Sequence, residues 1–192
     1  MDEKTSYLVL ASGSPQRLDL LRSVGFEPVV RVPNIDESII DEETAESLVE
    51  RLAITKLNAV IKKGECGVAA DTVVLINGNI LGKPGSPEKA VNMLNSLSGK
   101  THKVITGIAL SGPKGKRSST VVTKVRWRKL SEKEILTYVQ TGEPLNKAGG
   151  YGIQGGGADF VTSYDGSYEN IIGLPTCKVM TLLRELGCDC IT

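Results

Sequence analysis

A nearly continuous apolar run, Val68–Ile76, constrains the fold more than any other feature, and Asp71 interrupts it. An apolar run of this length, bounded by turn signals, is typical of a strand buried in a sheet. The Asn77-Gly78 dipeptide that follows it indicates a hairpin turn. A carboxylate inside a buried strand must be ion-paired, hydrogen-bonded or bound to a metal ion. Asp71 is therefore either a functional group in a cleft or a structural residue that caps a neighbouring element.

The rest of the chain mixes short apolar runs with stretches of helical spacing. Ser131 and Glu134 form a capping box at one helix start. A hairpin is expected around Asp165-Gly166, joining strands at 160–164 and 168–172. The sequence predicts an α/β fold in which a mixed, twisted β-sheet is flanked by helices, with residues 1–192 as a single domain. Further strands are expected at 7–11, 27–32, 104–110 and 120–127, and helices at 15–24, 44–63, 87–97 and 175–186.

Composition excludes several classes of protein. Lys and Arg total 23 against 22 Asp and Glu, so the net charge of +1 lacks the basic excess of a nucleic-acid-coating surface. No stretch approaches the roughly 20 apolar residues that cross a bilayer, and the first six residues do not resemble a secretory signal. We therefore expect neither a nucleic acid polymer nor a membrane as partner, and a cytoplasmic location.

The four cysteines match no paired zinc signature. Without a secretory signal they also give no reason to expect a disulfide framework. A soft metal at the Cys188/Cys190 pair is the alternative, but the pair has no second pair or nearby His to complete a site. We expect free thiols in a reducing compartment. The cysteines are Cys66, Cys177, Cys188 and Cys190.

The turn Ser12-Gly13-Ser14 has the features of an anion site. It follows an apolar strand and precedes a helix that Pro15 opens, so backbone N–H groups and the positive end of the helix dipole point at the turn. Arg17 stands in the first helical turn, where a basic residue opposes the dipole and an anionic ligand would resolve the mismatch. The alternative is an ordinary serine N-cap without a ligand.

Other polar residues extend this inventory. Lys56 falls on the apolar stripe of the helix at 44–63, either as a site residue or as a lysine that extends its ammonium group to the edge. Glu37 and Lys83 lie in loops, and Gln154 stands among six glycines between Gly149 and Gly157. Cationic groups clamp phosphoryl oxygens, carboxylates hold a divalent cation, and an amide can read a base edge. The set therefore indicates phosphate and metal chemistry.

These residues lie in short runs that resemble the Maf family, in order and nearly from end to end. The runs are Leu10-Ala11-Ser12-Gly13-Ser14-Pro15-Gln16-Arg17, Ile35-Asp36-Glu37, Arg51-Leu52-Ala53 with Lys56, Ala70-Asp71-Thr72-Val73, Gly82-Lys83-Pro84 and Tyr151-Gly152-Ile153-Gln154-Gly155, with further matches at 97–102 and 142–145.

The resemblance implies a nucleoside triphosphate pyrophosphatase of the Maf/inosine-triphosphatase-like fold, with two lobes and a central cleft. Such enzymes cut between the α and β phosphates with a divalent cation, Mg²⁺ or Mn²⁺. Asp71 matches the proton acceptor of the family, and Glu37 with Asp71 would hold the metal ion. Homologues are often dimeric, which implies a homodimer. The positions that bind phosphate in the family fall on Ser12, Ser14, Arg17, Lys56 and Lys83.

The run around Gln154 is similar to that of the branch acting on dTTP and UTP. Gln16, Thr72 and Gln154 match the positions linked to substrate choice, and Gln16 departs from the arginine usual there. Two alternatives remain open: a house-cleaning pyrophosphatase of the same fold acting on the purine nucleotides ITP and XTP, and a nucleotide-binding regulator of cell division. His102 is a further candidate general base, although a lone histidine at a strand start is more often structural.

Changing Gln16 to Arg should raise the affinity for nucleoside triphosphates, because it adds a cation beside Arg17 near the phosphates. The gain should shrink as salt is added, since salt screens interactions between exposed charges. Triphosphate affinity of both forms, measured at low and at high salt, checks this. A gain that does not depend on salt would show that the added charge is not its cause.

Overall fold

A mixed β-sheet organises the part of the chain that the computed structural model describes, residues 7–188. The strand order is β2-β1-β3-β5-β6-β7, and β4 pairs with β3 outside this path. β1 pairs in parallel with β2 and β3, whereas the pairs β3–β4 and β6–β7 are antiparallel. The predicted mixed sheet is confirmed. The strands are β1 Leu8–Leu10, β2 Val29–Val30, β3 Cys66–Ile76, β4 Asn79–Leu81, β5 Thr101–Gly112, β6 Gly115–Trp127 and β7 Val161–Asp165.

Helices connect most of these strands. Capping explains several of their starts: Thr44, Ser86 and Ser131 each accept a hydrogen bond from a first-turn backbone N–H, and Ser131 with Glu134 forms the predicted capping box. The α-helices are α1 Pro15–Ser23, α2 Ala45–Val60, α3 Pro87–Leu97, α4 Glu132–Gln140, α5 Tyr168–Ile172 and α6 Thr176–Glu185, and short 3₁₀ turns are η1 Glu143–Asn146, η2 Ala148–Gly150 and η3 Gly156–Phe160.

The chain divides into two compact units, each built from separate segments. The first contains the residues up to Asp71, Thr106–Val121 and the segment from Gly173 onward, and the second contains Thr72–Ile105 and Val122–Ile172. β3, β5 and β6 contribute residues to both units.

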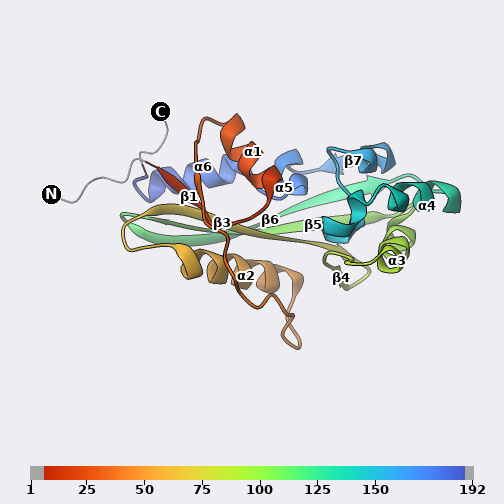
Figure 1. Cartoon of the computed structure of the whole chain (residues 1–192), viewed down its shortest axis with the longest axis horizontal. Helices are drawn as coiled ribbons and strands as arrows, with labels where there is room; N and C mark the ends of the chain where they lie inside the picture. Colours follow the sequence, from red (N-terminus) through yellow and green to blue (C-terminus); the bar gives the residue numbers. More distant parts are fainter. Residues whose placement is uncertain (1–6, 189–192) are drawn as a thin grey trace. The chain divides into compact units, whose positions relative to one another are not determined.

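In the first unit, helices cover both faces of the sheet. α2 lies on one side of β1 and β3, and α1 and α6 lie on the other (Figure 1). Small side chains let α2 approach closely, since Ala53 and Leu57 of the helix pack against Ala11, Ala69 and Ala109. β1 lies beside the first residues of β3, with Leu10 opposite Val68 and the Ala11 N–H donating to the Val68 carbonyl at 2.8 Å.

In the second unit, an aromatic cluster fills the core beside α3 and α4. Trp127 packs edge-on against Tyr151 and Phe160, and His102 packs edge-on against Trp127. His102 is buried and its Nε2 lies 2.8 Å from the Tyr151 hydroxyl. Burial lowers the pKa of His102 to about 4, so the ring stays neutral at physiological pH. These surroundings agree with the structural role expected for His102.

The predicted strand at 168–172 is wrong, because Tyr168–Ile172 forms the short helix α5. Ser167 accounts for the helix start, since its hydroxyl accepts a hydrogen bond from the Asn170 N–H at 3.1 Å. The Ser167 N–H donates to the Thr123 hydroxyl on β6 at 3.1 Å. A contact 44 residues away therefore fixes this turn, and local spacing did not indicate it.

The prediction of free thiols is wrong for Cys66 and Cys188, which form a disulfide between the start of β3 and the residue that follows the Gly187 turn. Both cysteines are buried, whereas Cys177 is exposed and free. Cys190 lies outside the described residues. The bond closes a separation of 122 residues, so it restricts the unfolded chain strongly.

Among the described residues, no helix is long and apolar enough to cross a membrane. The cytoplasmic location stays a prediction.

Changing Cys188 to Ala should lower the free energy of unfolding of the oxidised protein by about 2–4 kcal/mol, the usual contribution of a native disulfide. Cys177→Ala is the matched control, because it removes an exposed thiol that forms no disulfide. Denaturant unfolding with and without a dithiol reductant measures both. Equal stability of oxidised wild type and Cys188→Ala would contradict a stabilising disulfide.

Candidate active site

The turn after β1 places two polar side chains next to each other. The Ser12 hydroxyl is buried and accepts hydrogen bonds from the Ser14 N–H and from Arg17 Nη1, both at 3.2 Å. Arg17 Nε donates to the Gly173 carbonyl at 2.9 Å, which fixes the guanidinium from its other side. β1 and β3 run parallel, with Leu10 opposite Val68. The turn that follows β1 therefore lies beside the part of β3 that leads to Asp71. Ser12 and Arg17 are therefore held rigidly at this strand end.

Ser14 occupies the N-cap position of α1, but its hydroxyl does not cap the helix. The hydroxyl donates instead to Gln16 Oε1 at 3.1 Å. An ordinary serine N-cap is thus not what the structure contains. The start of α1 keeps the positive end of its dipole directed at the turn, as an anion site requires.

Lys56 is held inside the first unit instead of extending to the edge. Its side chain is only 8% exposed. The other buried residues of α2 are apolar, so Lys56 lies on the buried face of the helix. Its Nζ lies 2.8 Å from Glu37 Oε1 and 2.5 Å from Asp71 Oδ1. A buried ammonium group is tolerable only with such partners, so the alternative of a snorkelling lysine is wrong.

Asp71 lies in the middle of the buried strand and is itself buried. Its Oδ1 accepts a hydrogen bond from the charged Lys56 Nζ, which favours the functional interpretation over a capping role. Burial lowers the pKa of the Arg17 guanidinium, and the carboxylates of Asp71 and Glu37 counteract part of this effect. Two carboxylates and two cations therefore share one electrostatic site.

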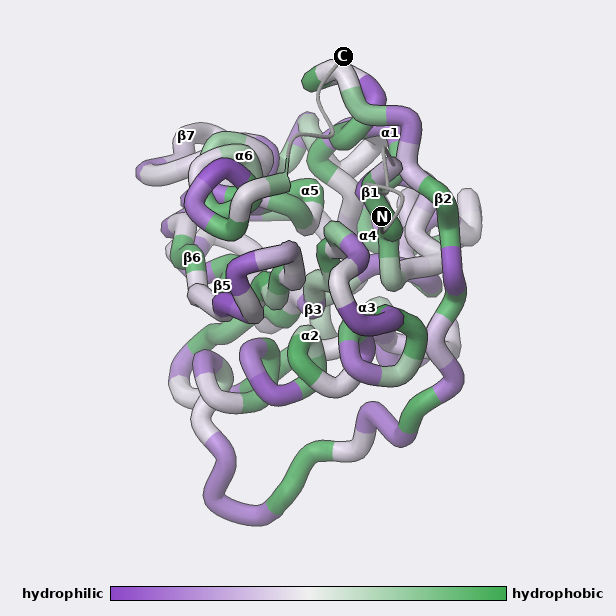
Figure 2. Tube along the Cα trace, turned by 90° about the vertical axis from the view of Figure 1, so that its left-hand side faces the viewer, coloured by the Kyte–Doolittle hydropathy of each residue, from purple (hydrophilic) through white to green (hydrophobic). Residues whose placement is uncertain are grey.

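Glu37 reaches this site from the long connection between β2 and α2, which carries alternating hydrophilic and hydrophobic residues (Figure 2). Arg51 of α2 fixes the connection by donating to the Ser38 carbonyl at 3.0 Å and to both oxygens of Glu43 at 2.7 and 2.8 Å. This ion pair lowers the pKa of Glu43. Sequence reasoning did not assign Arg51 a role, although it stands in the same short run as Lys56.

Thr72, Lys83 and Gln154 belong to the second unit. Thr72 is half-buried, and Lys83 and Gln154 are exposed on loops. The Gly149 N–H donates to the Gly82 carbonyl at 2.9 Å, so the loop of Lys83 and the glycine-rich segment are joined through their backbones. The structure thus brings together seven of the predicted residues in the first unit, and the other three belong to the second unit. The seven are Ser12, Ser14, Gln16, Arg17, Glu37, Lys56 and Asp71.

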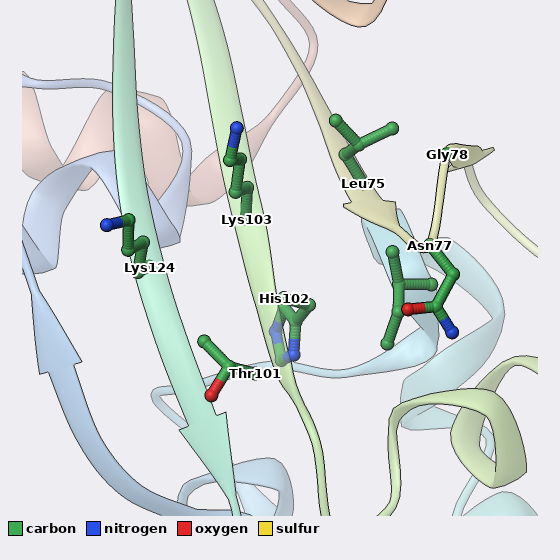
Figure 3. A pocket seen from close by; sticks show the side chains of 8 residues that line it. Leu75, Asn77, Gly78, Thr101, His102, Lys103 and Lys124 are labelled. Atoms are coloured by element: carbon green, nitrogen blue, oxygen red, sulfur yellow. The ribbon is translucent and has the colours of Figure 1, made fainter.

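The second unit also contains a shallow pocket of about 290 Å³. Lys103 of β5 and Lys124 of β6 line it together with Leu75 and Asn77 (Figure 3). Of the candidates named from the sequence, His102 lines this pocket, and the residues expected to bind phosphate, metal ion or base do not. Across residues 7–188, three or more His, Cys, Asp or Glu side chains do not gather into a group that could hold a metal ion. Any metal ion in the site therefore needs ligands beyond Glu37 and Asp71.

Comparison with known proteins identifies the family of the chain. The chain is 45% identical over 185 residues to the dTTP/UTP pyrophosphatase of Hahella chejuensis, covering 94% of this chain and 92% of the relative. The dTTP/UTP pyrophosphatase of Symbiobacterium thermophilum is 43% identical over 182 residues, with 94% of each chain covered. The family model described as Maf-like protein matches residues 7–186. The chain that carries this buried lysine, its two carboxylates and the Ser12–Arg17 turn therefore belongs to the Maf family.

Proposed function

We propose that the protein is a nucleoside triphosphate pyrophosphatase that hydrolyses dTTP and UTP to the nucleoside monophosphate and pyrophosphate. The observation that carries this is the buried Lys56 ammonium between Glu37 and Asp71, beside the start of α1. Its relatives are named dTTP/UTP pyrophosphatases, which supports the choice of nucleotide over the purine alternative.

The triphosphate would bind where cations and backbone N–H groups meet. Arg17 and Lys56 supply positive charge at the site, and the start of α1 supplies N–H donors and a positive dipole end. Ser12 is placed to donate its hydroxyl proton to a phosphoryl oxygen, since its oxygen already accepts two hydrogen bonds. Lys83 of the second unit is a further candidate for binding the β and γ phosphates.

Glu37 and Asp71 would be the protein ligands of a divalent cation, Mg²⁺ or Mn²⁺, because both ions prefer carboxylate oxygens. Both carboxylates contact Lys56 Nζ, so they lie near each other. A divalent ion typically takes one or two carboxylates from the protein and completes its shell with phosphate oxygens and water. When bound, the ion would neutralise charge on the phosphates. The homodimer stays a prediction.

Asp71 would accept the proton of the attacking water. As the O–H bond breaks, the water oxygen forms a bond to the α-phosphorus, and the bond from that phosphorus to the bridging α–β oxygen breaks. Pyrophosphate leaves with the electrons of that bond. Lys56 holds the Asp71 carboxylate in place through its hydrogen bond to Oδ1.

Incubation with UTP or dTTP and a divalent cation should yield the monophosphate and pyrophosphate. Product analysis by chromatography, across a panel that includes CTP, GTP, ITP and XTP, checks this. Orthophosphate with a diphosphate product would mean attack at the γ-phosphate and would sink the assignment. Faster hydrolysis of ITP or XTP than of UTP would favour the purine alternative.

Changing Asp71 to Asn should lower the turnover of UTP by about 100-fold or more, because the amide keeps the shape but cannot accept the proton. Asp19→Asn is the matched control, since Asp19 is an exposed carboxylate on α1. Turnover is measured on variants whose circular dichroism matches wild type. A folded Asp71→Asn variant with near-normal turnover would refute the catalytic role.

A further inference from the structure

Two side chains from outside the glycine-rich segment 149–157 hold it in place. Glu143 of η1 accepts a hydrogen bond from the Gly156 N–H at 3.1 Å and another from the Tyr138 hydroxyl at 2.9 Å. The Tyr138 hydroxyl of α4 accepts in turn from the Gly152 N–H at 3.1 Å. All of these residues lie in the second unit. We call Tyr138 and Glu143 the loop clamp.

The Glu143 carboxylate packs closely against the backbone of two glycines of the segment. A Cβ atom on Gly155 would lie no more than 2.7 Å from the carboxylate carbon and both oxygens, and one on Gly152 would lie 2.7 Å from Oε1. The φ of Gly155 is −123°, so close approach and not a left-handed backbone requires glycine here. The absence of a side chain at Gly152 and Gly155 therefore lets the Glu143 carboxylate reach the backbone of the segment.

The loop clamp contacts the segment on both sides of Gln154. Gly152 lies two residues before Gln154 and Gly156 two residues after it. Ile153 is buried and Gln154 is exposed, so the segment is anchored by its backbone and presents the amide to solvent. The direction of the Gln154 amide thus depends on contacts made by its neighbours.

We propose that Glu143 is a positioning residue for nucleotide recognition, which holds the loop so that Gln154 presents its amide in one orientation to the base of the substrate. The proposal rests on the proposed function and deepens it. An amide has a donor end and an acceptor end, so it distinguishes uracil and thymine from cytosine only when its orientation is fixed. Hydrogen bonds to a carboxylate are stronger than neutral ones, which suits Glu143 to fixing a glycine-rich loop.

The test compares Glu143→Gln with wild type. The amide keeps the size of the side chain but replaces one accepting oxygen with a group that only donates. We expect kcat/KM for UTP to fall about tenfold, the scale of losing a hydrogen bond to a charged group, and to fall less for CTP. Hydrogen–deuterium exchange of the amides at 152–156 should become faster. Tyr138→Phe should act the same way, because it removes the hydroxyl and keeps the ring that packs against Phe160.

Glu132→Gln is the matched control, since Glu132 is an exposed glutamate in the first turn of α4 and the loop clamp does not include it. A second comparison repeats Glu143→Gln in a Gln154→Ala background. If Glu143 acts through Gln154, the loss of discrimination between UTP and CTP disappears there. A general loss of stability would lower kcat/KM equally in both backgrounds and for both nucleotides.

The outcomes separate the two proposals. A wild-type protein that releases no pyrophosphate from UTP overturns the proposed function. The role of Glu143 is overturned if wild type is active and Glu143→Gln leaves both the preference for UTP over CTP and the hydrogen–deuterium exchange at 152–156 unchanged. The role of Glu143 is also overturned if Glu143→Gln lowers kcat/KM equally for UTP and CTP and does so in the Gln154→Ala background as well.

Discussion

A buried ammonium group shared by two carboxylates is the interaction on which the first unit depends. The Lys56 side chain joins α2 to β3 through Asp71 and to the β2–α2 connection through Glu37. Lys56 and Asp71 are both buried, and buried charges are stable only while each keeps a partner, so α2 and β3 cannot separate without a large cost. The Glu37 side chain is half exposed, so its contact with Lys56 contributes less. The same contact sets the geometry of the site. Stability of the unit and arrangement of the candidate catalytic group are therefore coupled through one atom, Lys56 Nζ.

Two of the three residues of this interaction, Asp71 and Lys56, stand out in the sequence because they break a pattern. Asp71 interrupts an apolar strand and Lys56 stands on an apolar helix stripe, and a charge in such a position demands an explanation. The sheet and most helices were predictable because the hydrophobic periodicity that indicates them is local in the sequence. The pairing of Cys66 with Cys188 was not, because spacing along the chain carries no information on which distant residues meet.

Residues that act through contacts in polar surroundings left no such signal. Arg51 and Glu143 stand among other polar residues, where a charge is expected, so nothing in the pattern marks them. The glycines around Gln154 indicated that something approaches the backbone closely, but only the structure shows that it is the Glu143 carboxylate. Likewise α5 depends on a hydrogen bond between Ser167 and Thr123, which local propensity does not contain.

The discontinuous make-up of the first unit has a consequence for the order of events on the ribosome. Its segments come from the beginning, the middle and the end of the chain, whereas every residue of the second unit precedes Gly173. Arg17 is fixed by the Gly173 carbonyl, and Cys66 waits for Cys188. During synthesis the second unit can therefore be complete while the first still lacks its last segment. The hydrogen bond that fixes Arg17 in the candidate active site consequently forms only after the second unit has been synthesised.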